Sequence, residues 1–276
     1  MTKYIKAGQF RVPEGYGAIV GHASESREFP YGGLFIRLAK LWMRASGTTV
    51  TVVGSENIPA DGGALLASNH TNYFDMVWVG IPAHLRGRRL VRFMAKKEIF
   101  EHRVAGVLMR SMKHLSVDRA AGTASVSEAV ARLKAGDLVA VFPEATVSLS
   151  YEIKELKSGA VRIAAEAGVP LIPVATWGGQ RILPKGGKAQ LGRKKIPVRV
   201  HVGTPIDPAG DPVERTAALK VALQELLEEA RGEYEREYGP FPGGESWRPA
   251  SLGGGAPTLE EAKEIEKKTK EERARR

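Results

Sequence analysis

The chain of 276 residues contains no cysteine, so disulfide bonds, thiolate nucleophiles and cysteine-bound metal ions are excluded. It also lacks an uninterrupted apolar run of the roughly 18 residues that a membrane-spanning helix needs. Residues 1–30 contain no apolar core of the signal-peptide type. The six histidines are scattered without the spacing of metal ligands, and no G-x-S-x-G motif of a serine hydrolase occurs. We therefore expect a soluble or peripheral protein without a bound metal.

Aromatic residues are also few, at 7%, whereas the charge balance is strongly basic, with a net charge of +10 and a pI of about 9.7. Such an excess of positive charge predicts an anionic partner, which can be a phosphorylated metabolite, an acidic lipid surface or a nucleic acid. Low aromatic content is unfavourable for stacking bases, and no helix-turn-helix, zinc or RNP motif is present. We therefore expect no nucleic-acid partner. If the chain is not an enzyme, the alternative is a basic nucleic-acid-binding protein.

Strand-like and helix-like segments alternate along most of the chain. The expected strands cover residues 48–53, 64–68, 91–95, 115–117, 138–142, 171–176 and 196–202. The expected helices cover residues 33–46, 74–82, 123–135, 158–167 and 211–238, with two short helices within 97–112. This alternation predicts an α/β layered domain with a mixed, largely parallel sheet flanked by helices. Active sites of such sheets lie beyond the carboxyl ends of the strands.

The composition changes near both ends of the chain. Residues 1–32 are rich in glycine, proline and charge, which predicts an irregular N-terminal arm. Residues 33–240 hold the alternating elements and are expected to form the catalytic domain. Residues 241–276 begin with glycine and proline and end in a dense run of mixed charge, which predicts a flexible linker and a charged tail.

A histidine and an aspartate lie five residues apart in the stretch SNHTNYFD, residues 68–75, directly after an apolar run. On one continuous α-helix, five residues turn about 500°, which leaves the two side chains roughly 140° apart. If the apolar run is a strand and the helix begins near Asn72, the turn between them can bring His70 back to Asp75. The carboxylate then fixes the imidazole tautomer and leaves the other nitrogen free to take a proton. The alternative is a turn histidine and an ordinary acid that is favourable at a helix N-terminus.

Further stretches follow in order along the chain, and together with the first they resemble the signature blocks of the glycerolipid acyltransferase family. They are FMAKKEIF at 93–100, SVDR at 116–119, VFPEATVS at 141–148 and AGVPLIPV at 167–174. The resemblance covers roughly residues 50–205. Each block alone is a weak indication, whereas their order and spacing make a strong one.

The resemblance implies an O-acyltransferase, in which His70 is the general base and Asp75 orients it. The donor would be acyl-CoA or acyl-carrier protein, which serves as a co-substrate, and no cofactor is expected. The acceptor would be the hydroxyl group of a lysophospholipid or of glycerol phosphate. The chemistry suits histidine, because an alcohol is a poor nucleophile at neutral pH and imidazole titrates in the useful range.

The resemblance also implies residues that bind the acceptor. Lys96 and Arg119 would hold its phosphate, as a point charge and as a bidentate partner respectively. Glu144, Ala145 and Thr146 would line the acceptor site. The alternatives are surface ion pairs for the two cations, Lys96 with Glu98 and Arg119 with Asp118, and a first-turn acid for Glu144.

Two departures from the family pattern are specific. Ala145 replaces a glycine, which makes a positive φ at this position less favourable. Val147 replaces an arginine that contacts phosphate in the family. Compensation can come from Lys154, Lys157 or Arg162, or the acceptor can be a glycolipid or an amino-acid lipid instead.

An anionic membrane surface is the remaining expected partner. On the helix at 33–46, three cations lie opposite a wide apolar face, a pattern typical of a helix in a membrane interface, although a helix packed on the core is the alternative. The cations are Arg37, Lys40 and Arg44, and the apolar side chains are Leu34, Phe35, Leu38, Leu41 and Trp42. Two basic clusters, at 86–92 and 185–195, are either a membrane-facing rim or solvated loops. We expect a cytoplasmic protein attached peripherally to the cytoplasmic face of the membrane.

Overall fold

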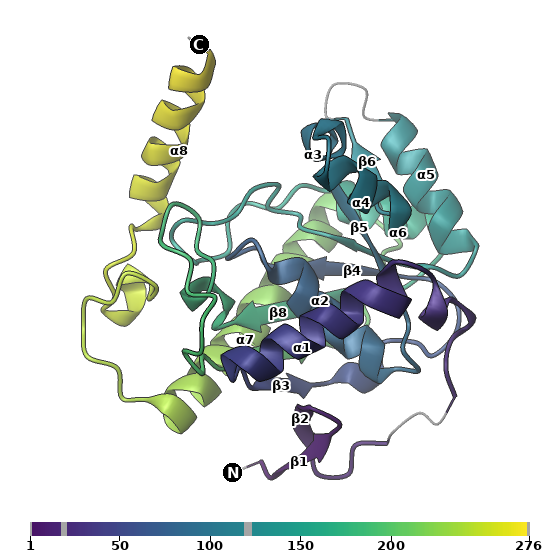
Figure 1. Cartoon of the computed structure of the whole chain (residues 1–276). Helices are drawn as coiled ribbons and strands as arrows, with labels where there is room; N and C mark the ends of the chain where they lie inside the picture. Colours follow the sequence, from purple (N-terminus) through teal and green to yellow (C-terminus); the bar gives the residue numbers. More distant parts are fainter. Residues whose placement is uncertain (1, 18–20, 119–122, 275–276) are drawn as a thin grey trace.

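The computed structural model describes residues 2–17, 21–118 and 123–274, and within them a nine-stranded sheet lies between two layers of helices (Figure 1). The strand order is β1-β2-β3-β9-β8-β4-β7-β5-β6. Only the β1–β2 and β8–β9 pairs of these strands are antiparallel. The predicted α/β layered architecture with a mixed, largely parallel sheet is confirmed.

The strands are β1 (Tyr4–Ala7), β2 (Phe10–Pro13), β3 (Val50–Val53), β4 (Ala64–Ser68), β5 (Val91–Lys96), β6 (Leu115–Val117), β7 (Leu138–Val141), β8 (Leu171–Trp177) and β9 (Val198–Val202). The helices are α1 (Ile36–Ser46), α2 (Asp75–Leu85), α3 (Lys97–Glu101), α4 (Ala105–Ser111), α5 (Thr123–Lys134), α6 (Gly159–Ala167), α7 (Pro212–Tyr238) and α8 (Leu259–Ala274). A π-helical turn at Tyr31–Phe35 leads into α1.

The sheet is covered on both faces, which explains why the central strands β4 and β8 are mostly apolar. Helices α1 and α2 pack on one face, where they bury side chains such as Met43, Trp78 and Val79. Helices α5, α6 and α7 pack on the other face. In Figure 1, α7 lies behind the sheet. Every residue of β4, β8 and β9 is buried as a result. Strands buried on both faces are continuously hydrophobic rather than alternating.

The prediction of an irregular N-terminal arm is wrong for residues 4–13, which form the β1–β2 hairpin. β2 joins the sheet beside β3, where Arg11 pairs with Thr51. Phe10 and Val12 alternate into the core and are 3% and 0% exposed. Gly8, with φ of 64°, supplies the left-handed turn between the strands. This two-residue alternation is too short to stand out among the surrounding glycine, proline and charged residues.

Part of the predicted linker at 241–258 packs on the domain. Phe241 and Trp247 contact Tyr234 of α7, with ring centroids 5.8 and 6.4 Å apart, and Trp247 lies 6.4 Å from Trp177. The charged tail continues as α8, which begins at a capping box in which Thr258 and Glu261 exchange hydrogen bonds. Aromatic burial and capping therefore order residues that composition alone assigned to a linker.

One predicted helix boundary needs correction. The helix predicted to end near Pro82 continues as α2 to Leu85, because its apolar side chains remain buried against the sheet on both sides of the proline. On α7 the buried face includes Leu219, Leu223, Leu227 and Ala230, whereas Leu226 is only partly buried.

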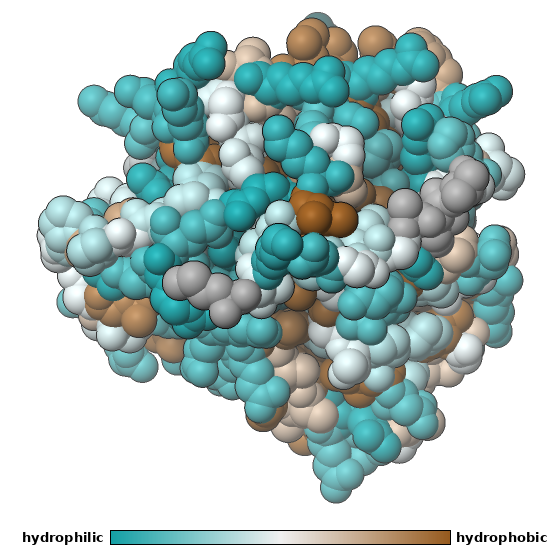
Figure 2. All heavy atoms as spheres, turned by 90° about the horizontal axis from the view of Figure 1, so that it is seen from below, coloured by the Kyte–Doolittle hydropathy of each residue, from teal (hydrophilic) through white to brown (hydrophobic). Residues whose placement is uncertain are grey.

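Helix α1 packs on the core through the face that includes Ala39, Met43 and Ser46, not through its leucines. Three leucines of the segment are exposed instead, namely Leu34 by 44%, Leu38 by 53% and Leu41 by 62%. The molecule seen from below is mostly hydrophilic, with hydrophobic side chains in scattered groups, some of them at the upper rim and near the centre of the view (Figure 2). None of the helices in the described ranges combines the length and apolar character that crossing a membrane requires.

Candidate functional site

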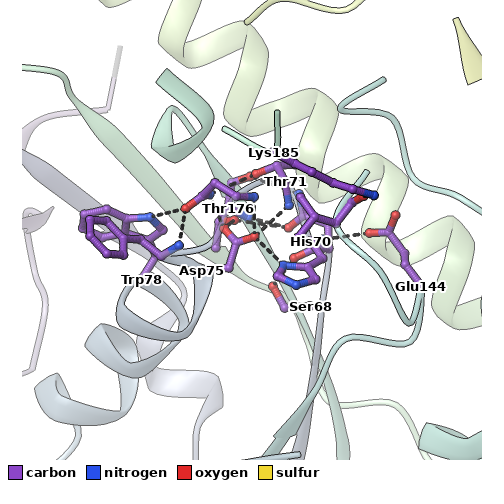
Figure 3. Close-up of polar contacts among 12 residues, drawn as sticks. Ser68, His70, Thr71, Asp75, Trp78, Glu144, Thr176 and Lys185 are labelled. Atoms are coloured by element: carbon purple, nitrogen blue, oxygen red, sulfur yellow. Dashed lines mark hydrogen bonds and ion pairs between the residues drawn. The ribbon is translucent and has the colours of Figure 1, made fainter. Parts of the chain in front are cut away.

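His70 and Asp75 meet at the carboxyl edge of the sheet, in the turn that joins β4 to α2 (Figure 3). The imidazole Nδ1 lies 2.9 Å from Asp75 Oδ2. The strand ends at Ser68 and Asp75 is the first residue of the helix, so the intervening turn folds His70 back onto the carboxylate. The predicted strand–turn–helix arrangement of this pair is therefore present.

The surroundings of Asp75 fix which imidazole nitrogen carries a proton. The carboxylate is fully buried, and its Oδ2 accepts hydrogen bonds from the backbone N–H groups of Thr71 and Asn72 at 2.7 and 2.9 Å. Its Oδ1 accepts from the Thr176 hydroxyl at 3.0 Å and from the Asn72 amide. A carboxylate that accepts four bonds is an acceptor toward His70 as well, so Nδ1–H donates. The lone pair then lies on Nε2.

The imidazole is held in place but remains partly open, with 19% of its side chain exposed. Its ring stacks on Phe142, with centroids 4.1 Å apart and planes 14° apart. The backbone of His70 is fixed from the second motif, because its N–H donates to Glu144 Oε1 at 2.8 Å and its C=O accepts from Ser148 N–H at 2.7 Å. Nε2 has no hydrogen-bond partner among the described residues. Nε2 can therefore take a proton from a molecule bound next to it.

Glu144 connects the two motif loops from within the protein. It is 6% exposed, and its second carboxylate oxygen accepts from Lys154 N–H at 3.2 Å. Burial raises the pKa of Glu144 to about 7, although the two backbone hydrogen bonds and the Lys154 charge act in the opposite direction. The residue lies in a turn after β7 and not in a helix, so the alternative of a first-turn acid is wrong. Its contacts make it a brace for the loop that carries His70.

The loop after Glu144 differs from expectation at Ala145. This residue adopts φ of 64° despite its Cβ, so the left-handed conformation expected of glycine is kept here. Thr146 is exposed and its hydroxyl accepts from Lys154 Nζ. Val147 is buried, at 5% exposed, and its C=O accepts from Lys185 Nζ at 3.1 Å. Two lysines therefore reach the loop in which the expected arginine is missing.

Of the two residues predicted to hold phosphate, the structure describes Lys96, which lies at the same edge of the sheet as His70. Lys96 is exposed at the carboxyl end of β5, a strand that is next to β7 in the sheet. Asp118 forms an ion pair with Lys97 at 3.1 Å, and the described residues show no ion pair between Lys96 and Glu98. Arg119 lies outside the described residues.

Several residues that shape the site were not among the predicted ones. Asn69 links β4 to β8, since its amide donates to Thr176 C=O at 3.1 Å and accepts from Thr176 N–H at 2.8 Å. Asn72 Oδ1 accepts from Phe74 N–H at 2.8 Å and from the Trp78 indole at 3.3 Å. Thr176 ends a predicted strand next to β4, so strand order together with its position would have indicated it.

The first basic cluster is neither a membrane-facing rim nor a set of solvated loops. Arg89 is 4% exposed and donates to the C=O groups of Pro59, at 3.1 Å, and Gly62, at 2.6 Å. Arg92 is 1% exposed and donates to Glu28 at 2.9 Å. Among these arginines only Arg88 is exposed. In the second cluster, Lys185 is partly buried, and the residues from 188 onward are exposed.

A small pocket lies elsewhere, between α1, α2 and β5. It is lined mainly by apolar side chains and by His84 and His114, and burial lowers the pKa of these histidines to about 4 and about 3. None of the motif residues lines it, so it is not the catalytic site.

Comparisons with known proteins show which family the chain resembles. A family model described as Acyltransferase matches residues 49–177. The chain is 31% identical over 195 residues to the 1-acyl-sn-glycerol-3-phosphate acyltransferase of Bacillus subtilis, a match that covers 68% of this chain and 90% of that relative. It is 29% identical over 191 residues to a chloroplastic 1-acyl-sn-glycerol-3-phosphate acyltransferase of Arabidopsis thaliana, covering 66% of this chain and 52% of that protein.

A solved structure has the same fold. The crystal structure of the 1-acyl-sn-glycerophosphate acyltransferase PlsC from Thermotoga maritima superposes with a TM-score of 0.55 and 24% sequence identity. The match covers 75% of this chain and 91% of that one. At this identity the likeness concerns the fold.

Proposed function

Because the chain belongs to the glycerolipid acyltransferase family, we propose that it moves a fatty acyl group from acyl-CoA or acyl-carrier protein to a hydroxyl group of a lysophospholipid or glycerol phosphate. The observation that carries this proposal is the His70–Asp75 pair, with Nδ1 on the buried carboxylate at 2.9 Å and Nε2 without a partner among the described residues. An acceptor hydroxyl within about 3 Å of Nε2 would meet the geometric requirement for a general base.

The proposed reaction needs no acyl-enzyme. Nε2 takes the proton of the acceptor hydroxyl as its oxygen attacks the thioester carbonyl carbon, and the negative charge of Asp75 stabilises the imidazolium that forms. The tetrahedral intermediate then collapses with cleavage of the C–S bond. The thiolate receives the proton from Nε2, which restores the neutral imidazole and releases the thiol and the new ester.

For the acceptor we propose a phosphate-bearing glycerolipid such as lysophosphatidate, in line with the acceptor named in both curated relatives. Lys96 would contact the phosphate as an exposed cation at the carboxyl end of β5, and Arg119 would assist it. Glu144 would act through the backbone of His70 rather than through the acceptor, since both its oxygens bond backbone N–H groups. No cofactor enters this proposal.

An anionic membrane surface is the proposed partner from which the acceptor is taken. Exposed apolar side chains lie on α1 and near α4, where Leu38, Leu41, Val104 and Val107 are each more than half exposed. Exposed cations adjoin them, namely Arg37, Arg44, Arg103 and Arg110. Apolar side chains beside cations suit an anionic bilayer, because burial in the interface and attraction to acidic lipids add together. We propose peripheral attachment through this surface, on the cytoplasmic face.

Acyl transfer is tested by thiol release from acyl-CoA, and separately from acyl-carrier protein, across a panel of acceptors. The panel holds glycerol 3-phosphate, lysophosphatidate, and lysophospholipids with larger headgroups. We expect release that depends on acceptor and is fastest with a phosphate monoester. Release that ignores the acceptor would show a thioesterase, and no release with either acyl donor would contradict the proposal.

A further inference from the structure

Two lysines beside the loop that follows β7 hold an acidic side chain from the last helix. Lys154 Nζ donates to the Thr146 hydroxyl and lies 3.4 Å from each carboxylate oxygen of Glu266. Lys185 Nζ donates to Val147 C=O at 3.1 Å and to Glu266 Oε1 at 2.8 Å. Each ammonium group is thus fixed by one bond to the loop and directed toward the same anion.

Both lysines come from segments that contact the loops of the catalytic pair. Lys154 follows the loop braced by Glu144, to which its own N–H donates at 3.2 Å. The loop of Lys185 lies on the first motif, since Pro184 forms a β-bridge with Asn72. Figure 3 shows the Lys185 side chain extending over the turn that carries His70, toward the side where Glu144 lies.

Helix α8, which supplies Glu266, buries little other side-chain surface against the domain. Among the described side chains of α8, only Ala262 is buried, while Glu266 is 27% exposed and most of the others are exposed. In Figure 1 α8 projects away from the sheet. Burial alone would raise the pKa of Glu266, but the hydrogen bond from Lys185 and the charges of both lysines lower it, so the carboxylate is the anion here.

We propose that Lys154 and Lys185 supply further cations for the phosphate group of the acceptor, in addition to Lys96 and Arg119, and that Glu266 occupies the place between these two lysines until the acceptor replaces it. This inference rests on the proposed function. A phosphate monoester carries a charge of about −1.5 to −2 at pH 7 and three acceptor oxygens, so it satisfies two ammonium groups better than one carboxylate. Helix α8 thereby competes with the acceptor, and its release opens the site.

Binding of soluble phosphates tests the site without any turnover. Isothermal titration calorimetry would use inorganic phosphate and sn-glycerol 3-phosphate with the full chain, Glu266→Gln, Lys154→Met and Lys185→Met. We expect glycerol 3-phosphate to bind at least about fivefold more tightly to Glu266→Gln, because the competing charge is gone. Each lysine variant should bind at least about tenfold more weakly, as expected for the loss of a charge-assisted contact. Glu264→Gln and Lys267→Met, exposed charges on α8, are the matched controls and should bind as the wild type does.

Steady-state kinetics decide whether the site binds the phosphate of the acceptor or a free phosphate ion. With lysophosphatidate as acceptor, Glu266→Gln should lower the acceptor KM and the lysine variants should raise it, with the donor KM unchanged; Lys185→Arg should keep binding. Tighter phosphate binding without a change in acceptor KM would place a free-anion site there and overturn the assignment. Equal binding by all variants would overturn the site itself while leaving acyl transfer intact. Phosphate binding that needs both lysines, in a protein that transfers no acyl group, would contradict the proposed function instead.

Discussion

Glu144 is the buried carboxyl group at the junction of the two motif loops, and its charge state affects the stability of the fold. Burial raises its pKa from 4.5 to about 7. A carboxyl group whose folded pKa lies above its unfolded value stabilises the fold when protonated. Its contribution is complete below pH 4.5 and is lost as the pH rises through about 7.

Replacing Glu144 with glutamine removes this titration. We expect the free energy of unfolding of the wild type to fall relative to Glu144→Gln as the pH rises from 4.5 to 7. At about 1.4 kcal/mol for each pKa unit, the relative loss should reach roughly 3 kcal/mol. Urea unfolding at a series of pH values measures it. Parallel pH profiles of the two proteins would show that Glu144 titrates normally.

At the scale of single residues, the sequence indicated the catalytic pair better than the residues that hold this pair in place. The His70–Asp75 pair could be predicted because a turn after an apolar run allows the two side chains to meet, and the resemblance to the acyltransferase family favoured this geometry over the alternative. The brace from Glu144 could not, since it depends on where Lys154 returns to the loop after β7. Ala145 shows the same limit, because the surrounding contacts hold it at positive φ against its own preference.

At the scale of elements, regular periodicity predicted the central strands of the sheet and its helices. Short segments and segments of mixed composition were not predicted. β4 and β6 begin and end as predicted, because their apolar runs are bounded by clear turns. The β1–β2 hairpin was missed because its attachment depends on partners more than 180 residues away. Tyr4 donates to Glu233 at 2.9 Å, and Arg11 pairs with Glu237.

Arg199 connects these partners from β9. Its side chain is 2% exposed and forms ion pairs with both Glu233 and Glu237 of α7. Removing it leaves two carboxylates that lose their shared cation, so we expect Arg199→Met to lower the free energy of unfolding by about 3 kcal/mol. Urea denaturation measures the loss.

The control for this variant is the exposed pair of Lys3 with Glu14, whose side chains are 76% and 55% exposed. Lys3→Met should change the free energy of unfolding by about 1 kcal/mol at most. If both variants unfolded at the same denaturant concentration, the Arg199 network would not hold the hairpin and α7 to the sheet.

At the scale of the whole molecule, the exposed leucines of α1 give a test of membrane attachment. We expect wild-type protein to co-sediment with anionic vesicles at low salt and Leu38→Ser, Leu41→Ser to lose most of this binding. Both side chains are more than half exposed, so the double variant should fold normally. Phe35 and Trp42 are less suitable targets, because both are partly buried against the core.

The matched control is Val213→Ser, Val221→Ser on α7, which removes apolar side chains that are 73% and 52% exposed. This variant should bind vesicles as the wild type does. Wild-type protein that stayed in the supernatant, or equal loss in both variants, would exclude α1 as the attachment surface.

The most direct test of the catalytic account is acyl transfer by His70→Ala. Thiol release from acyl-CoA with lysophosphatidate as acceptor should fall by at least about 10²-fold, the least expected for loss of a general base. Asp75→Asn should retain part of the activity, since the imidazole remains but loses its charged partner. Urea unfolding confirms that each variant is folded. The account predicts a folded and nearly inactive His70→Ala, whereas a folded His70→Ala with near-wild-type transfer would contradict it.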